Sequence, residues 1–107
     1  MFYDYADSGS WEEITYRDNE QRFRDIRLRQ RVAVNIEQRS LASRMAGESV
    51  AMPVALAPCG MTGMQFPDGE IHAALAAERF GVPFTLSTMS ICSIEDVAAR
   101  TSRPFWF

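Results

Sequence analysis

Val54-Ala55-Leu56-Ala57-Pro58-Cys59-Gly60-Met61 is the stretch that decides the fold. Its first four residues are continuously apolar, which is typical of a buried strand covered on both faces. Pro58 lacks the N–H that a longer ladder would need, so we expect the strand to stop there and open into a turn. Gly60 has no Cβ, and its backbone can therefore approach a flat ligand closely.

The segment after this turn predicts a helix. We expect it to cover residues 69–80, with Asp68 as its cap and Gly81 as its C-terminal stop. One face of small and apolar residues is expected to lie against a sheet, and it comprises Ala73, Ala76, Ala77 and Phe80. Strand, loop and helix are the unit of α/β barrels and doubly wound sheets, in which ligands bind at the carboxyl ends of strands. The Pro58–Met61 loop is therefore the first candidate site.

The same alternation continues to the end of the chain. Residues 83–88 are expected to form a second strand that becomes polar at its end, and residues 104–107 begin a third. Between them, Ser93 and Asp96 have the spacing of a capping box. The buried stripe of the short helix that follows is expected to be Ile94, Val97 and Ala98. This order implies right-handed crossovers between parallel strands.

The first half of the chain is more polar and predicts shorter elements. Residues 1–9 are expected to form a helical turn. Ser10-Trp11-Glu12-Glu13 has the pattern of a capping box and predicts a helix over residues 11–23. Short strands are expected over residues 32–36 and 49–52, on either side of a polar loop.

Composition restricts the class of protein. The chain has 107 residues, of which 47% are hydrophobic, as expected for one globular domain or part of one. No apolar run has the length of a membrane span, and no signal-peptide pattern opens the chain. Cys59 and Cys92 fit no metal-site spacing. We therefore expect free thiols, no bound metal and a reducing, cytoplasmic location.

The charge of the chain gives no general attraction to nucleic acid, because the net charge is −3. A basic cluster does occur, at Arg22, Arg24, Arg27, Arg29 and Arg31. A nucleic-acid patch is one interpretation of this cluster, but no aromatic platform or binding motif accompanies it. A solvated face is the default interpretation, and we expect no nucleic-acid partner.

Few residues suggest catalysis by themselves. His72 is the only histidine, and a helix-surface position is favoured over a role as general base. Cys59 could be a reactive thiol, but with no basic neighbour in sequence a small buried residue is favoured. Ser87 and Thr88 end the second strand, where hydroxyls either bind a ligand or satisfy the backbone. No Gly-x-Gly-x-x-Gly or Walker pattern is present.

Ordered motifs along the whole chain resemble a known family. They are Tyr3–Gly9, Met52–Pro58, Gly69-Glu70, Leu86–Thr88, Ser93–Ala98 and Phe105–Phe107. In this order they resemble the FMN-dependent 2-hydroxy-acid dehydrogenases and oxidases, most of all the bacterial members that act on L-lactate. The resemblance implies a TIM-type (β/α)8 barrel. Residues 1–52 would be the segment before the barrel, and residues 53–107 its first βα units.

The resemblance also implies roles for particular residues. Tyr5 resembles the tyrosine whose hydroxyl binds the substrate carboxylate. The loop that lies against the flavin would be formed by Pro58, Cys59 and Gly60. In it, the Gly60 N–H would face the reactive flavin nitrogen, and Ser87 would hydrogen-bond the ring. Met89 lies where some relatives carry a larger aromatic residue that shapes the substrate pocket.

The family's catalytic histidine, substrate-binding arginines and flavin-contacting lysine have no match here, and His72 corresponds to none of them. We therefore expect an N-terminal fragment of an enzyme that oxidises an L-2-hydroxy acid to the 2-oxo acid with hydride transfer to FMN. By itself the chain would be inactive.

Several partners follow from the resemblance. They are a small 2-hydroxy acid, an electron acceptor (quinone, cytochrome or oxygen) and, for the complete protein, further copies of itself. The resemblance allows a position at the inner face of the membrane as well as in the cytoplasm. Two alternatives stay open: a non-catalytic α/β fragment or interaction module, and another FMN- or phosphate-binding barrel enzyme. Tyr5 and its Tyr-Asp-Tyr setting argue against the second.

Overall fold

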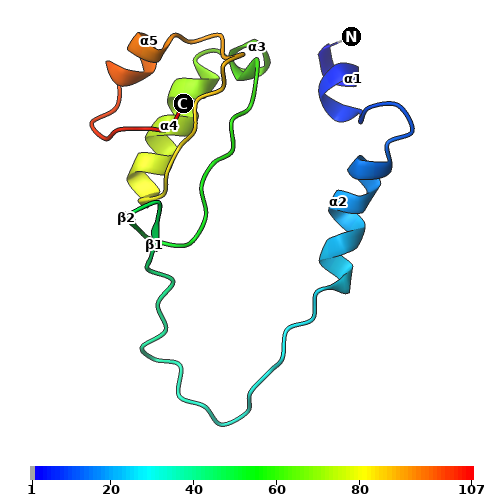
Figure 1. Ribbon diagram of the computed structural model, residues 1–107, viewed down its shortest axis with the longest axis vertical. Helices are drawn as coiled ribbons and strands as arrows, with labels where there is room; N and C mark the ends of the chain where they lie inside the picture. Colours follow the sequence, from blue (N-terminus) through cyan, green and yellow to red (C-terminus); the bar gives the residue numbers. More distant parts are fainter. Residues whose placement is uncertain (1) are drawn as a thin grey trace. The chain divides into compact units, whose positions relative to one another are not determined.

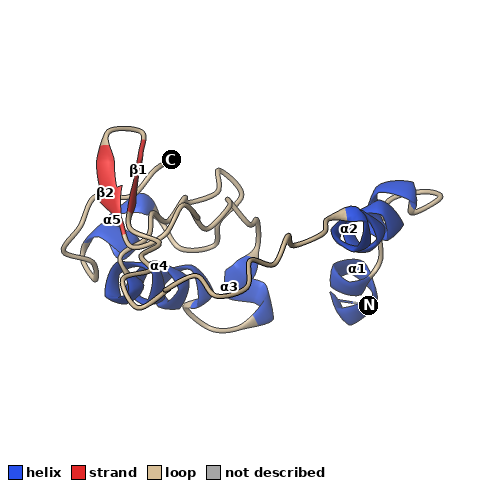
Figure 2. Ribbon diagram, turned by 90° about the horizontal axis from the view of Figure 1, so that it is seen from below, coloured by secondary structure: helices blue, strands red, loops and turns tan. Residues whose placement is uncertain are grey.

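The computed structural model describes residues 2–107, without the side chain of Phe2, and the chain divides into two compact units. They are Met1–Gln38 and Arg39–Phe107. Figures 1 and 2 show their elements. The predicted division between residues 52 and 53 concerns the start of a barrel and stays a prediction. Among residues 2–107, every helix is too short or too polar to cross a bilayer.

Two helices form the first unit. α1 (Phe2–Asp7) confirms the helical turn expected near the start of the chain, of which Met1 lies outside the described residues. α2 (Ile14–Asp25) begins three residues later than predicted. Trp11 and Glu13 have φ values of 55° and 57°, so the backbone there is left-handed and cannot be helical. The predicted capping box is therefore wrong. The Glu13 carboxylate instead accepts the N–H of Gly9, at 3.0 Å.

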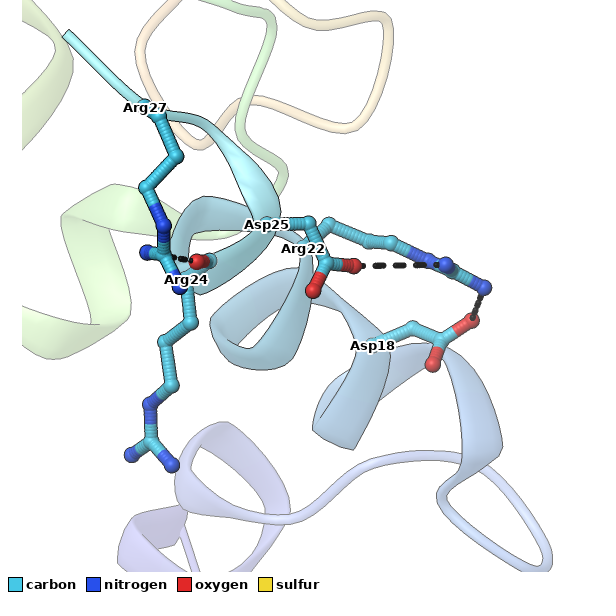
Figure 3. A network of polar contacts seen from close by, with 5 residues as sticks. All are labelled: Asp18, Arg22, Arg24, Asp25 and Arg27. Carbon is cyan, nitrogen blue, oxygen red and sulfur yellow. Dashed lines mark hydrogen bonds and ion pairs between the residues drawn. The ribbon is translucent and has the colours of Figure 1, made fainter.

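The arginines of α2 and the segment after it point into solvent. Arg22 lies between Asp18 at 3.6 Å and Asp25 at 3.5 Å (Figure 3). The guanidinium of Arg27 donates to the carbonyl of Arg24. All these side chains are exposed, as expected for a solvated face. Exposed ion pairs of this kind contribute little to stability.

The strand predicted over residues 32–36 does not form. Ala33 has φ 57°, which breaks an extended segment, and residues 26–38 contain no helix or strand. The predicted strand over residues 49–52 is β2 (Glu48–Val50), and its partner is β1 (Ser43–Met45). They pair antiparallel, and the two residues of the turn both have positive φ, at 47° for Ala46 and 87° for Gly47.

Three extended segments of the second unit lie parallel, as predicted. Isolated bridges join Leu56 to Phe84 and Thr85 to Trp106, so the segment around residues 83–86 lies in the middle. The pairings are too short to count as strands, and Figure 2 therefore draws these segments as loops beside the red hairpin. The expected parallel order is confirmed, although each pair of neighbouring segments is joined by one isolated bridge and not by a full ladder.

The first of these segments is more exposed than its sequence predicts. Val54 is 42% exposed, and Ala57 is exposed as well. The segment has one parallel neighbour among the described residues, and a tight turn from Val54 N–H to the Met52 carbonyl (2.8 Å) precedes it. The expectation of a strand covered on both faces is therefore wrong for the described residues.

α4 (Gly69–Phe80) has the predicted bounds. Gly81 ends it with φ 82°, and its N–H donates to the carbonyls of Ala77 and Glu78. Asp68 does not cap it, because Asp68 has φ 54° and its side chain makes no capping bond. In Figure 1 the hairpin lies at the C-terminal end of α4, where the Ala51 N–H donates to the Gly81 carbonyl at 2.8 Å.

The buried face of α4 differs from the predicted one. Its buried residues are Gly69, Glu70, Ile71, Ala74 and Ala77. Of the predicted face only Ala77 is fully buried, and Phe80 is 60% exposed. Together with Phe84, Leu86 and Val97, the apolar members of this face form the core of the second unit.

Two short helices complete the second unit. α3 (Thr62–Gln65), which the sequence did not predict, lies at the N-terminal end of α4 (Figure 1). α5 (Ile94–Ala98) confirms the predicted capping box, since the Asp96 N–H donates to Ser93 Oγ (3.1 Å) and the Ser93 N–H to Asp96 Oδ2 (3.2 Å). Of the predicted stripe only Val97 is buried. A helix of five residues, less than two turns, is too short to bury more.

Candidate functional site

Two loops follow the parallel segments, and they meet. The first loop (residues 58–68) leads from the first segment to α4, and the second loop (residues 87–93) leads from the middle segment to α5. The Met61 N–H donates to the Met89 carbonyl at 2.9 Å. A Cβ at Gly60 would lie 3.1 Å from the Met89 Cβ and 3.7 Å from Ser87 Oγ. The structure therefore brings together Gly60, Ser87 and Met89.

The meeting point is open and carries unused donors. Pro58, Cys59 and Gly60 are exposed, and Ser87 is half-buried. Among the described residues, no group accepts the Gly60 N–H. Ser87 Oγ accepts the Met89 N–H at 3.1 Å, which leaves the hydroxyl proton free to be donated elsewhere. A backbone donor and a hydroxyl donor thus lie together at the carboxyl ends of two parallel segments.

This arrangement fits the edge of a flat heteroaromatic ring. Gly60 presents backbone without a side chain, and a Cβ there would fill the space between the two loops. Ring nitrogens and carbonyl oxygens accept hydrogen bonds of the kind that an N–H and a hydroxyl can donate. The residues present therefore suit a flavin, the group that the resemblance implies.

Cys59 differs from its prediction, because it is an exposed free thiol rather than a small buried residue. The first parallel segment ends at Pro58, so the side chain of Cys59 lies away from the core. Its carbonyl accepts the hydroxyl of Thr62 at 3.1 Å, which helps to shape the first loop. Cys92 is free as well and half-buried, as the expectation of free thiols requires.

Sequence reasoning missed the role of Glu70, which is only 2% exposed. Its Oε1 accepts the N–H of Gly63 at 2.9 Å and the N–H of Ile91 at 3.1 Å. Burial raises the pKa of this carboxyl, but the N–H donors outweigh it and hold the pKa below its ordinary value. The only signal in the sequence was that the Gly69-Glu70 pair is one of the family motifs, and no role was assigned to that pair.

Two further residues that the sequence analysis weighed belong to helices and not to the two loops. Tyr5 is on α1 in the first unit, with its side chain 67% exposed, and its role stays a prediction. His72 is exposed on α4, as predicted for a helix-surface histidine, with its ring edge-on to Phe66 at 5.7 Å between centroids. It is not a candidate base on this geometry.

Known proteins match the chain along its whole length. The family model described as FMN-dependent dehydrogenase matches residues 1–107. An L-lactate dehydrogenase of Xanthomonas campestris is 51% identical over 107 residues, and one of Vibrio parahaemolyticus is 49% identical. Each alignment covers all of this chain and 28% of the relative. The chain thus spans little more than a quarter of the length of these curated relatives.

Solved structures agree with the sequence matches. A soluble mutant of the membrane-associated (S)-mandelate dehydrogenase of Pseudomonas putida superposes with a TM-score of 0.92 at 35% identity, covering 99% of this chain and 30% of that one. A mandelate oxidase superposes with a TM-score of 0.87 at 29% identity, covering 97% and 30%. These neighbours are α/β enzymes of the TIM-barrel type. The predicted family resemblance is confirmed.

Proposed function

This chain belongs to the FMN-dependent dehydrogenase family, and on that premise we propose that it supplies the first flavin-binding loops of an L-2-hydroxy-acid dehydrogenase or oxidase. The reaction is oxidation of the hydroxy acid to the 2-oxo acid. The observation that carries the proposal is the contact between Gly60 and the Ser87–Met89 segment, which joins two donors at one open edge. The complete protein is a (β/α)8 barrel in this proposal.

FMN, when bound, supplies the hydride acceptor. The chain's own residues bind and orient it. Gly60 would donate its N–H, and Ser87 its hydroxyl proton, to polar atoms of the bound group. Two such donors would favour negative charge on the group beside them. The loop of Pro58, Cys59 and Gly60 would lie against it with little side-chain bulk.

The substrate in this proposal is a small L-2-hydroxy acid resembling L-lactate. Tyr5 binds its carboxylate through the phenolic hydroxyl, a charge-assisted bond. Met89, which is 65% exposed, contributes a flexible apolar wall to the substrate pocket. L-lactate dehydrogenases resemble this chain in sequence, and a mandelate dehydrogenase resembles it in structure. In this proposal the size of the wall at Met89 helps to decide between small and large hydroxy acids.

Proton abstraction needs a base within hydrogen-bond reach of the substrate hydroxyl. The only imidazole in the sequence is His72, which lies on the outside of α4 against Phe66. We therefore assign the base to a part of the barrel beyond these residues, and we expect the 107-residue chain alone to be inactive. A quinone, a cytochrome or oxygen reoxidises the flavin, and the complete protein is a homo-oligomer.

The location in this proposal is the cytoplasm or the inner face of the membrane. A mandelate dehydrogenase similar to this chain is described as a monotopic membrane protein, which supports the second possibility.

A chimera tests the proposed function. Residues 1–107 of this chain replace the matching segment of the Xanthomonas campestris relative, which supplies the rest of a barrel. We expect yellow protein that reduces an artificial dye with L-lactate and reacts more slowly with mandelate. The unmodified relative is the control. A folded chimera that holds flavin but oxidises neither acid would contradict the proposed substrate class.

The leading alternative is a non-catalytic module. It predicts a 107-residue chain whose partner binding is independent of flavin, and a chimera without flavin. Absorbance of the purified chimera in the visible range therefore separates the two readings before any assay of turnover.

A further inference from the structure

We propose that Glu70 is a positioning residue that holds the first loop and the second loop in the register needed to bind FMN, an inference that rests on the function proposed above. Its single Oε1 accepts N–H groups from both loops, at Gly63 (2.9 Å) and at Ile91 (3.1 Å). Gly63 comes three residues after Gly60, and Ile91 four residues after Ser87. The carboxylate therefore connects the first loop and the second loop, which carry the flavin-facing donors.

The packing around Glu70 requires two glycines. A Cβ at Gly63 would lie 2.9 Å from Glu70 Oε2 and 2.9 Å from the Ile91 Cβ. A Cβ at Gly69 would lie 2.8 Å from Thr62 Cγ2 and 2.9 Å from the Thr62 carbonyl oxygen. All four distances are shorter than real Cβ contacts, so the first loop reaches the start of α4 only because these two positions have no side chain.

The bond between Glu70 and the loops is charge-assisted. The N–H donors hold the pKa of Glu70 below its ordinary value in spite of burial, so the carboxylate is ionised at neutral pH. Burial and, after it, the Glu70 carboxylate raise the pKa of the neighbouring Cys92 thiol, which stays neutral. Within the part of the chain described, Oε2 is buried and accepts no hydrogen bond, so the two N–H contacts at Oε1 make the connection to both loops.

The direct contacts between the two loops are short-range and few. The Met61 N–H donates to the Met89 carbonyl, Gly60 approaches Ser87 and Met89, and Gly63 approaches Ile91. Met89 and Ile91 are exposed, so their side chains do not anchor these contacts in the core. Glu70 is anchored, because it lies in the first turn of α4 and is buried.

Glu78 provides a matched control on the same helix. Its carboxylate also accepts a backbone N–H, that of Ser102 at 3.1 Å, and it also binds the Ser102 hydroxyl. These contacts lie beyond α5, away from both flavin-facing loops. Glu78→Gln therefore makes the same chemical change without touching the proposed cradle.

The experiment compares Glu70→Gln, Gly63→Ala and Glu78→Gln in the chimera, by FMN titration and by visible circular dichroism of the bound flavin. Glu70→Gln keeps the shape but loses the charge from two hydrogen bonds, so we expect FMN binding to weaken roughly tenfold or more. Gly63→Ala displaces the carboxylate from the other side and should act in the same direction. Glu78→Gln should stay within about twofold of the parent chimera.

Hydrogen exchange on the 107-residue chain gives a second readout that needs no flavin. In Glu70→Gln we expect faster exchange of the Gly63 and Ile91 amides, with no change at Ser102. FMN affinity and the flavin spectrum, measured on folded protein well below the unfolding midpoint, separate positioning from mere stability. A lower unfolding midpoint with unchanged affinity and spectrum would overturn the proposal, as would unchanged exchange at both amides.

The two proposals fail differently. If the parent chimera binds no FMN, the proposed function is contradicted and the role of Glu70 falls with it. If the parent chimera binds FMN and the Glu70→Gln and Gly63→Ala chimeras bind it equally well, only the role of Glu70 is contradicted.

Discussion

Leu86→Ala should strongly destabilise the second unit and thereby disturb the site. Leu86 is 2% exposed and belongs to a small core shared with Phe84 and Val97. Its N–H donates to the Trp106 carbonyl at 2.8 Å, so it also fixes the middle parallel segment. Truncating a buried leucine costs about 2–5 kcal/mol, of which part is the cavity left behind. Because domains are stable by only about 5–15 kcal/mol, we expect the variant to lose a large share of its free energy of unfolding.

The matched control is Leu28→Ala, which makes the same chemical change at a side chain that is 91% exposed. Urea unfolding of both variants is followed by far-UV circular dichroism. The free energy of unfolding should be lower than that of the parent by at least about 2 kcal/mol for Leu86→Ala, and should stay within about 0.5 kcal/mol of it for Leu28→Ala. Ser87 follows Leu86 directly, so FMN binding by the corresponding chimera should fall as well. Equal unfolding midpoints for the two variants would refute the assignment of this core.

Three further predictions concern single side chains. Tyr5→Phe in the chimera should raise the KM for L-lactate by about tenfold or more, since a hydrogen bond to a carboxylate contributes about 1.5–3 kcal/mol, and an unaltered KM would count against Tyr5 as a substrate ligand. Because the pKa of Glu70 is lowered, its stabilising effect is present above the ordinary pKa of 4.5 and is lost as the pH falls through the lowered value. The urea midpoint of the parent should therefore fall more steeply on acidification than that of Glu70→Gln. Ser93→Ala removes the cap of α5 and should cost about 1 kcal/mol by the same unfolding assay, whereas no change would mean that α5 does not support Val97 in the core.

The elements that sequence predicts best here are those with local causes. α4 has its predicted bounds because a glycine with positive φ ends it after a run of helix-forming residues. α5 follows its capping box because Ser93 and Asp96 satisfy each other over three residues. The parallel order of three segments also follows from the alternation of apolar runs with helices.

The failures have causes that lie outside the local pattern. Ser10 and Glu13 match a capping box, but the backbone between them is left-handed and the helix starts later. The segment at 32–36 is mostly apolar and β-branched, but it has no partner strand among the described residues, and Ala33 leaves the extended region. A short apolar run shows which side chains could be buried, and not whether a neighbouring strand exists to pair with them.

The residues of the candidate site were named from the sequence in part. The resemblance pointed to Gly60 and Ser87, which the structure brings together, and their role toward flavin stays a prediction. Glu70 could not be found from local sequence, because its partners are 7 and 21 residues away along the chain. A carboxylate that satisfies N–H groups of two distant loops leaves no periodic signal. Its two glycine neighbours become meaningful only once the distances are known.

The central claim, that residues 58–60 and 87–89 form part of an FMN site, is tested most directly by the flavin content of the chimera. We predict one FMN per chain, measured by visible absorbance against protein concentration after removal of free flavin, as for the unmodified Xanthomonas campestris relative under the same conditions. A folded chimera that binds no FMN, beside a relative that binds it, would contradict the account.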